Sequence, residues 1–173
     1  DIRYSNIASI LKNLNKIPES KKYLVSAVKL NPHDGNHWLS LGWIEHQYGK
    51  IYHAIELYKK SIIYLDDDEK GWPLNNIANA YVRIGENKLA YEYYMESQKF
   101  TNKYDIYQNY MCNLTYITDD LKKIYDEHRK YTKIFDDKSN HTFLEKQKSK
   151  VNGKIRVGYF SPDFRVHSVA YFF

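Results

Sequence analysis

The sequence predicts an all-helical protein built from antiparallel helix pairs, followed by the beginning of a separate α/β region. Three observations support this prediction. Residues of the same kind recur about every 34 residues up to residue 104, helix-stopping residues separate the recurring segments, and a short apolar segment follows a polar stretch at residues 136–152. We therefore expect helix pairs at residues 1–34, 35–68 and 69–104, a partial pair, connector helix and linker at 105–152, and the start of a second domain at 153–173.

Length and composition exclude several classes of protein. A chain of 173 residues with 43% hydrophobic content can form a real core, which excludes wholesale disorder. No run of about 18 apolar residues occurs, so no membrane-spanning helix is expected. The single cysteine, Cys112, excludes an internal disulfide framework and favours a reducing, cytoplasmic location. The net charge of +5 is spread thinly along the chain, which argues against a nucleic-acid partner.

The second segment carries the clearest repeat pattern: Trp38, Leu41, Gly42, Gly49, Ala54 and Tyr58. Similar residues recur 34 positions earlier and 36 positions later, and the two extra residues fall in the turn at residues 66–71. This pattern resembles the tetratricopeptide repeat, a unit of about 34 residues that opens with Trp-x2-Leu-Gly. The resemblance implies an α-solenoid in which each unit is a pair of antiparallel helices.

Physical chemistry explains the residue types at the recurring positions. One small residue in each first helix lets the second helix approach closely: Ala8, Gly42 and Ala78. Asn31-Pro32 ends the second helix of the first unit, because proline cannot continue it. Gly49 and Gly85 permit turns with positive φ.

The pattern weakens after residue 104. Residues 105–118 read as another first helix, with Met111 and Cys112 at packing positions, where we expect the thiol to be buried. Asp119-Asp120 then opens an amphipathic helix, since acidic residues suit a helix N-terminus. One face of that helix is expected to carry Leu121, Ile124, Tyr125, His128, Thr132 and Phe135.

The last segment has a different character. Ile155–Phe160 is a short apolar run rich in β-formers, which predicts a buried strand of the parallel type. A loop at residues 161–167 follows, and Ser168 is placed to cap a helix. Strand, loop and helix start predict the opening of a βα unit.

Tetratricopeptide units followed by Lys154–Phe173 resemble the O-linked N-acetylglucosamine transferases, and more specifically their bacterial-type members. The resemblance rests on the run Arg156-Val-Gly-Tyr-Phe-Ser-Pro-Asp-Phe-Arg-Val-His-Ser-Val169. Residues 108–114 and Glu127-His128-Arg129 also look like the segment that precedes the catalytic region in those enzymes.

The resemblance implies a GT-B catalytic domain with two Rossmann-like lobes, of the inverting, metal-independent kind. Such an enzyme transfers N-acetylglucosamine from UDP-GlcNAc to Ser or Thr of proteins, without a bound cofactor. Only the first strand and helix start of that domain are present here, so residues 1–173 alone are expected to be inactive.

His167 is the catalytic candidate, matched through Ser161-Pro-Asp-Phe164. The resemblance implies a place at the donor and acceptor site, either as the base or as a contact to the donor. General chemistry is compatible with both roles, because imidazole titrates near neutrality and loops at strand ends bind ligands in α/β sheets.

Acceptor-binding candidates lie in the first helix of each unit, at the sixth position of the unit: Asn6, Ser40 and Asn76. The family carries a ladder of Asn there that holds the acceptor backbone, and Ser40 departs from it. Asn79, at the ninth position, joins this set, and Trp43 at the same position is expected to be packed. The alternative interpretation is that these are only polar residues of a wet surface.

Two other functions stay open. The first is a peptide-binding adaptor that catalyses nothing, and the second is a related glycosyltransferase that uses another UDP-sugar. A metal site is not expected, because the histidines are scattered without ligand spacing: His33, His37, His46 and His53.

Overall fold

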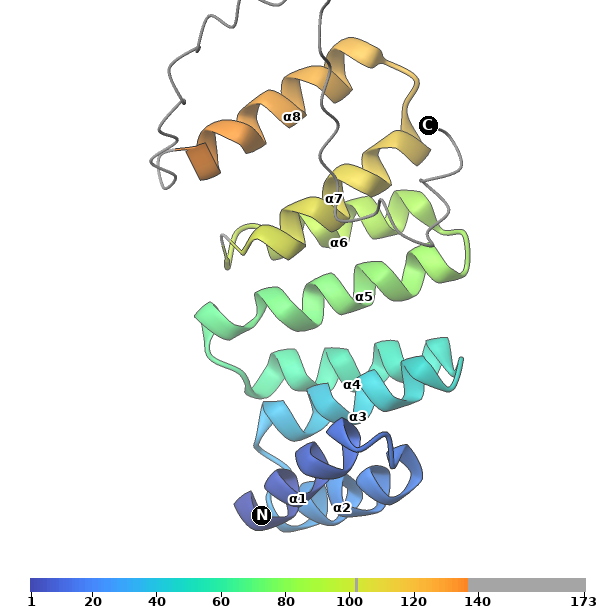
Figure 1. Ribbon diagram of the computed structural model, residues 1–173, viewed down its shortest axis with the longest axis vertical. Coiled ribbons are helices and arrows are strands. Elements are labelled where there is room, and N and C mark those ends of the chain that lie inside the picture. Colours follow the sequence, from blue (N-terminus) through green and yellow to red (C-terminus); the bar gives the residue numbers. More distant parts are fainter. Residues whose placement is uncertain (102, 137–173) are drawn as a thin grey trace, which may run out of the picture. The chain divides into compact units, whose positions relative to one another are not determined.

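A computed structural model describes residues 1–101 and 103–136. These residues form α-helices that follow one another along the chain and pack each on the next (Figure 1). The helices are α1 (Ile2–Asn13), α2 (Ile17–Leu30), α3 (Gly35–Gln47), α4 (Ile51–Tyr64), α5 (Gly71–Arg83), α6 (Asn87–Ser97), α7 (Tyr104–Ile117) and α8 (Leu121–Asp136). A short 3-10 helix, η1 (Asp67–Glu69), lies in the turn that holds the two extra residues. The predicted all-helical stack of antiparallel pairs is confirmed for this part of the chain.

The small residues in the first helices lie where the two helices of a unit meet. Ala8 and Ala78 are buried, and a Cβ atom added to Gly42 would come within 2.7 Å of the Tyr58 ring. The aromatic residue of α4 therefore uses the space that the glycine leaves free. This close contact explains why a small residue recurs at that position.

The turns inside the three units share one backbone conformation. Gly49 and Gly85 have φ of 75° and 83°, as predicted, and Asn15 takes the same place in the first unit with φ of 58°. The next residue closes the turn each time, as in the 2.8 Å hydrogen bond from the Lys16 amide to the Leu11 carbonyl. Asn is the residue that best replaces glycine in this left-handed region.

Helix α7 covers α6 as a further first helix, and Ile106, Tyr110 and Leu114 are buried. The prediction for Cys112 was wrong, because its side chain is exposed. In the earlier units the equivalent small residue is covered by the second helix. Here an open groove of about 400 Å³ between α7 and α8 leaves the thiol accessible.

Helix α8 begins as predicted after an acidic cap, since Asp120 Oδ1 accepts hydrogen bonds from the amides of Lys122 and Lys123. The face of α8 that was predicted to be apolar is only partly buried. The Glu127 carboxylate accepts a 3.3 Å hydrogen bond from the Tyr110 hydroxyl, whereas Leu121 and Tyr125 are exposed. No helix among the described residues is long and apolar enough to cross a bilayer.

Candidate polypeptide-binding surface

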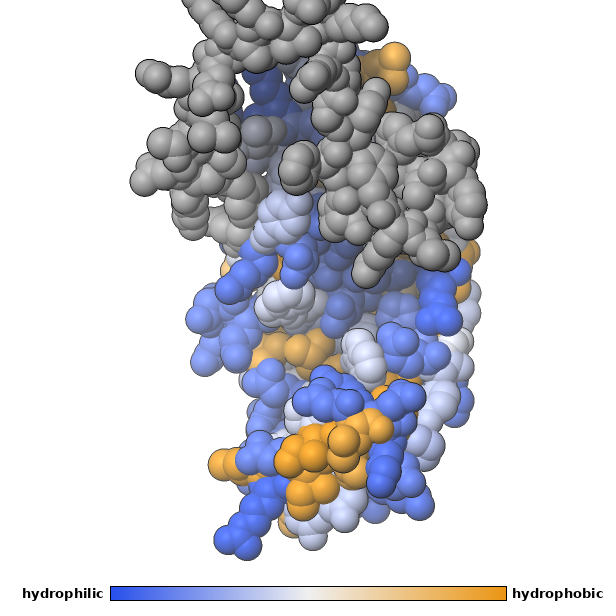
Figure 2. Space-filling model, in the orientation of Figure 1, coloured by the Kyte–Doolittle hydropathy of each residue, from blue (hydrophilic) through white to orange (hydrophobic). Residues whose placement is uncertain are grey.

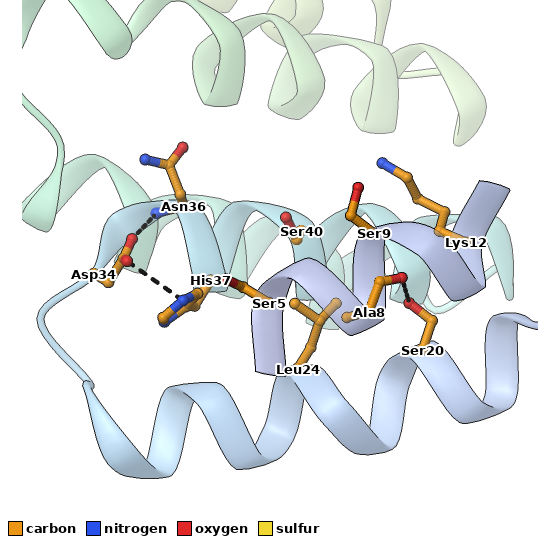
Figure 3. Close-up of a pocket in the computed structure, with 10 residues that line it drawn as sticks. All are labelled: Ser5, Ala8, Ser9, Lys12, Ser20, Leu24, Asp34, Asn36, His37 and Ser40. Carbon is orange, nitrogen blue, oxygen red and sulfur yellow. Dashed lines mark hydrogen bonds and ion pairs between the residues drawn. The ribbon is translucent and has the colours of Figure 1, made fainter. Parts of the chain in front are cut away.

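A small pocket lies between α1, α2 and α3, with a volume of about 130 Å³ (Figure 3). Its apolar base includes Ala8 and Leu24. The remaining wall is mostly polar and comes largely from the first helices α1 and α3: Ser5, Ser9, Lys12, Asn36 and Ser40. Hydroxyl, amide and ammonium groups thus line one opening, and Figure 3 shows Ser9, Lys12 and Asn36 pointing to the same side of it.

His37 lies deep in this pocket with only 3% of its surface exposed. Its Nε2 atom lies 3.3 Å from Asp34 Oδ2, while the other oxygen of Asp34 caps α3 by accepting from the Asn36 amide. The Nδ1 atom of His37 has no hydrogen-bond partner among the described residues. The pocket therefore contains a buried polar atom whose hydrogen-bonding capacity is unused.

The first-helix candidates occupy different surroundings. Ser40 lines the pocket, as do Ser5 and Ser9 of α1. Asn6 lies next to Ser5, is exposed, and is not among the residues that line this pocket. In α3 the residue at the sixth position of the unit, Ser40, lines the pocket. In α1 the residues at the fifth and ninth positions, Ser5 and Ser9, line it instead of Asn6.

Asn79 is held in place by the second helix of its own unit. The Tyr94 hydroxyl donates a 2.5 Å hydrogen bond to Asn79 Oδ1. Burial raises the pKa of Tyr94, so this hydroxyl stays protonated and remains a donor at physiological pH. Because the amide oxygen is occupied, the half-buried Asn79 can present its Nδ2 donor to a ligand.

A second amide pair joins α5 to α7. Asn109 Nδ2 donates a 3.1 Å hydrogen bond to Asn75 Oδ1, and Asn75 is buried. Asn76, the predicted residue beside it, is half-buried. Sequence reasoning followed the sixth position and missed this pair, although the 34-residue spacing of Asn75 and Asn109 carries the signal.

Trp43 occupies the position in α3 that Asn79 occupies in α5. It is half-buried against the core around Leu41 and Ile44, which confirms that it is a packed aromatic. The Lys12 ammonium lies 5.2 Å from the centre of its ring, a cation–π contact between the first two units. Lys12 thus places a positive charge at the edge of the pocket.

The C-terminal end of α3 is hydrogen-bonded to α5. Arg83 Nη1 donates a 2.7 Å hydrogen bond to the His46 carbonyl. Burial lowers the pKa of His46, and the nearby Arg83 charge lowers it further. His46 is therefore neutral at physiological pH.

The polar residues of the first helices described above are treated together as one candidate binding surface. We call this set the polar surface: Ser5, Ser9, Lys12, Asn36, Ser40, Asn76 and Asn79.

The linker, the predicted strand and the loop with His167 lie outside the described residues. In residues 1–101 and 103–136, no group of three or more His, Cys, Asp or Glu side chains is arranged so that it could hold a metal ion.

Comparison with known families identifies the class of protein. The family model described as tetratricopeptide repeat matches residues 3–34 and 73–104. Together with the helix pairs, this match shows that the chain contains tetratricopeptide repeats. The family match ends at residue 104, so it does not bear on the glycosyltransferase-like segment near the C-terminus. No curated protein sequence matches the chain.

Solved structures share the fold at low sequence identity. MamA superposes with a TM-score of 0.61 at 17% identity, covering 76% of this chain and 73% of MamA. YrrB, described as a TPR protein with an unusual peptide-binding site, gives 0.62 at 16% identity, covering 76% and 66%. PilF of Pseudomonas aeruginosa gives 0.65 at 12% identity, covering 79% and 60%. At such identities the likeness concerns the fold alone.

Proposed function

We propose that the polar surface binds an extended polypeptide, and that this surface is the acceptor-binding part of a protein O-glycosyltransferase. The observation that supports binding most strongly is the fixed amide of Asn79, whose oxygen is occupied by Tyr94. A preorganised donor of this kind costs little entropy when it binds a carbonyl oxygen of a peptide backbone.

The rest of the polar surface complements a backbone in the same way. Hydroxyl groups of Ser9 and Ser40 both donate and accept, and the buried His37, which lines the same pocket, has an Nδ1 atom without a hydrogen-bond partner among the described residues. Backbone groups are the same in every sequence, so such contacts tolerate many different acceptors. Lys12 adds a preference for acidic side chains or a carboxylate nearby.

The transferase part of the proposal rests on the run from Arg156 to Val169. In an inverting transfer, the acceptor Ser or Thr oxygen attacks C1 of N-acetylglucosamine as UDP leaves and a base takes the hydroxyl proton. His167 is our candidate either for that base or for a hydrogen bond to the donor diphosphate.

The direct test uses the full-length product of the gene, incubated with radiolabelled UDP-GlcNAc and a cell lysate, beside its His167→Ala variant. Label on protein from the wild type that disappears with the variant supports both the transferase and the site. Label from both proteins keeps the transferase and removes His167 from the site. No label from the wild type, with UDP-glucose tried in parallel, contradicts the transfer of either sugar.

A peptide-binding adaptor is the second candidate function. It is favoured by the fold match to YrrB, whose description names a peptide-binding site. An adaptor requires only the polar surface, so it predicts peptide binding by residues 1–173 with no sugar transfer by any longer form of the protein.

A further inference from the structure

Helix α1 carries an apolar strip that no described helix covers. Ile7 is 40% exposed and Ile10 is 59% exposed, and Leu14 at the end of the helix is exposed as well. Figure 2 shows a hydrophobic patch over this end of the described stack. Leu11, one turn after Ile7, is half-buried.

The corresponding positions are buried in every later first helix. The equivalents of Ile7 and Ile10 are Leu41 and Ile44 in α3, Ile77 and Ala80 in α5, and Met111 and Leu114 in α7, and none exceeds 7% exposure. In α5 these residues pack on Ile51, Ile55 and Tyr58 of the preceding second helix, α4. The strip on α1 thus has the side chains of an internal first helix without the second helix that normally covers them.

We propose that this strip, formed by Ile7, Ile10, Leu11 and Leu14, is the docking surface for the second helix of a further tetratricopeptide unit joined ahead of residue 1. A helix that ends such a stack normally presents a polar outer face, because its outer side meets water. The strip presents large aliphatic side chains instead. The inference does not depend on the polypeptide-binding proposal.

Comparing Leu11 with the equivalent residues of the later first helices indicates which kind of second helix would pack on the strip. In α3 the equivalent residue is the buried Glu45, whose carboxylate forms an ion pair with the partly exposed Lys21 of α2. In α5 it is Tyr81, which belongs to the same apolar cluster as Ile55 of α4. Lys21 and Ile55 are equivalent residues of their second helices. Leu11 should therefore pack well against a second helix that has an apolar residue at this equivalent position, as α4 has Ile55. A second helix with a lysine at that position, like α2, would bury a charge against Leu11 and is disfavoured.

A second copy of this chain fits the strip less well. Among the described residues, α2 is covered by α3, α4 by α5, and α6 by α7. Within that part of the chain, the one helix of a second copy that has no later helix packed on it is α8, and it exposes Lys122 and Lys123 beside Leu121. Continuity of the stack favours an additional unit, whose second helix would meet α1 as α4 meets α5.

The test adds a unit to the complete chain. A copy of residues 35–68, which supplies α4 with its Ile55, is joined directly ahead of Asp1, and amide hydrogen exchange is measured in α1. We expect exchange in α1 to slow by about tenfold or more. Replacing Ile55 by lysine in the added copy alone should remove most of this slowing. A second extension, made from residues 69–104, gives an independent version if the first one does not fold.

A matched pair of variants separates docking from general destabilisation. Ile10→Lys should leave α1 exchange nearly unchanged in the original chain, since the side chain is exposed, but abolish the slowing in the extended chain. Ile63→Lys should change neither, since Ile63 is also largely exposed, on the outer side of α4. Equal α1 exchange with and without the added units would overturn the proposal. So would a dimer of the original chain in sedimentation experiments that Ile10→Lys dissociates, because the occupant would then be a second copy.

Discussion

The Tyr94 hydroxyl donates a 2.5 Å hydrogen bond to Asn79 Oδ1, which joins the two helices of the third unit at the polar surface. The contact links a buried tyrosine of the core to an amide that can meet a ligand. Packing of the second helix therefore determines the orientation of a group on the first helix.

Removing this hydroxyl should weaken polypeptide binding without removing any ligand contact. We expect Tyr94→Phe to lower the affinity for a bound peptide about threefold, because the Asn79 amide would lose its fixed orientation. Tyr58→Phe is the matched control, since Tyr58 is the equivalent residue of the second unit and its hydroxyl lies 3.5 Å from His46 Nδ1 instead. Fluorescence anisotropy of a labelled peptide gives both affinities. Equal losses in the two variants would contradict a role for the Tyr94 contact.

The close approach of α3 and α4 predicts the sign of a stability change. Gly42→Ala places a Cβ atom within 2.7 Å of the Tyr58 ring, and we expect a loss of about 1–3 kcal/mol in the free energy of unfolding by urea. At an exposed helical site the same substitution would stabilise by about 1 kcal/mol. Ser9→Ala, exposed on α1, should change stability by less than about 0.5 kcal/mol. A more stable Gly42→Ala variant would be inconsistent with the packing described above.

The buried carboxylate of Glu45 predicts a pH dependence. Burial alone would raise its pKa, but the hydrogen bond and charge of Lys21, with Lys50 and His53 nearby, lower it from the ordinary 4.5. A carboxyl group with a lowered pKa in the folded state stabilises the protein above pH 4.5, and this contribution is lost as the pH falls through the folded-state pKa.

Glu45→Gln should therefore lower the free energy of unfolding by about 2 kcal/mol at pH 7. The difference from the wild type should shrink below pH 4.5, where the wild type loses the same contribution. Glu56→Gln, exposed on α4, is the control and should follow the wild-type curve. Urea denaturation across this pH range measures the effect, and a difference independent of pH would argue against the ion pair as its source.

The amide pair between α5 and α7 should appear as an energetic coupling. In a double-mutant cycle of Asn75→Ala and Asn109→Ala, we expect a coupling of about 1 kcal/mol in unfolding free energy, because each amide satisfies the other. Asn75→Ala combined with Asn36→Ala, two helices away, should be additive. Additivity in the first cycle would show that the 3.1 Å contact does not contribute to stability.

The repeating fold could be predicted because its signals are local. Gly49 and Gly85 mark turns that require positive φ, and Gly42 marks the contact with Tyr58. Such residues are specified by backbone geometry and volume within one unit, so a fixed spacing is enough to find them. Asn15 replaces glycine at the equivalent turn and fits the same rule.

The details of the surface depend on contacts between units, which spacing alone does not determine. Cys112 stands at the small-residue position, yet it is exposed because α8 leaves an open groove beside α7. The unpartnered Nδ1 of His37 likewise follows from the packing of three helices around one pocket. The predicted role of His167 stays a prediction, since that residue lies outside the described part of the chain.

Mapping a bound peptide by NMR tests the central proposal most directly. A 12-residue peptide selected from a random library against residues 1–173 is titrated into the labelled chain, and the side-chain amide signals are followed. We expect the largest shifts at Asn36, Asn76 and Asn79, little change at Asn15 in its turn, and an affinity reduced about three- to tenfold by Asn79→Ala. Shifts concentrated on the second helices α2, α4 and α6, with Asn79→Ala binding like the wild type, would contradict the proposal.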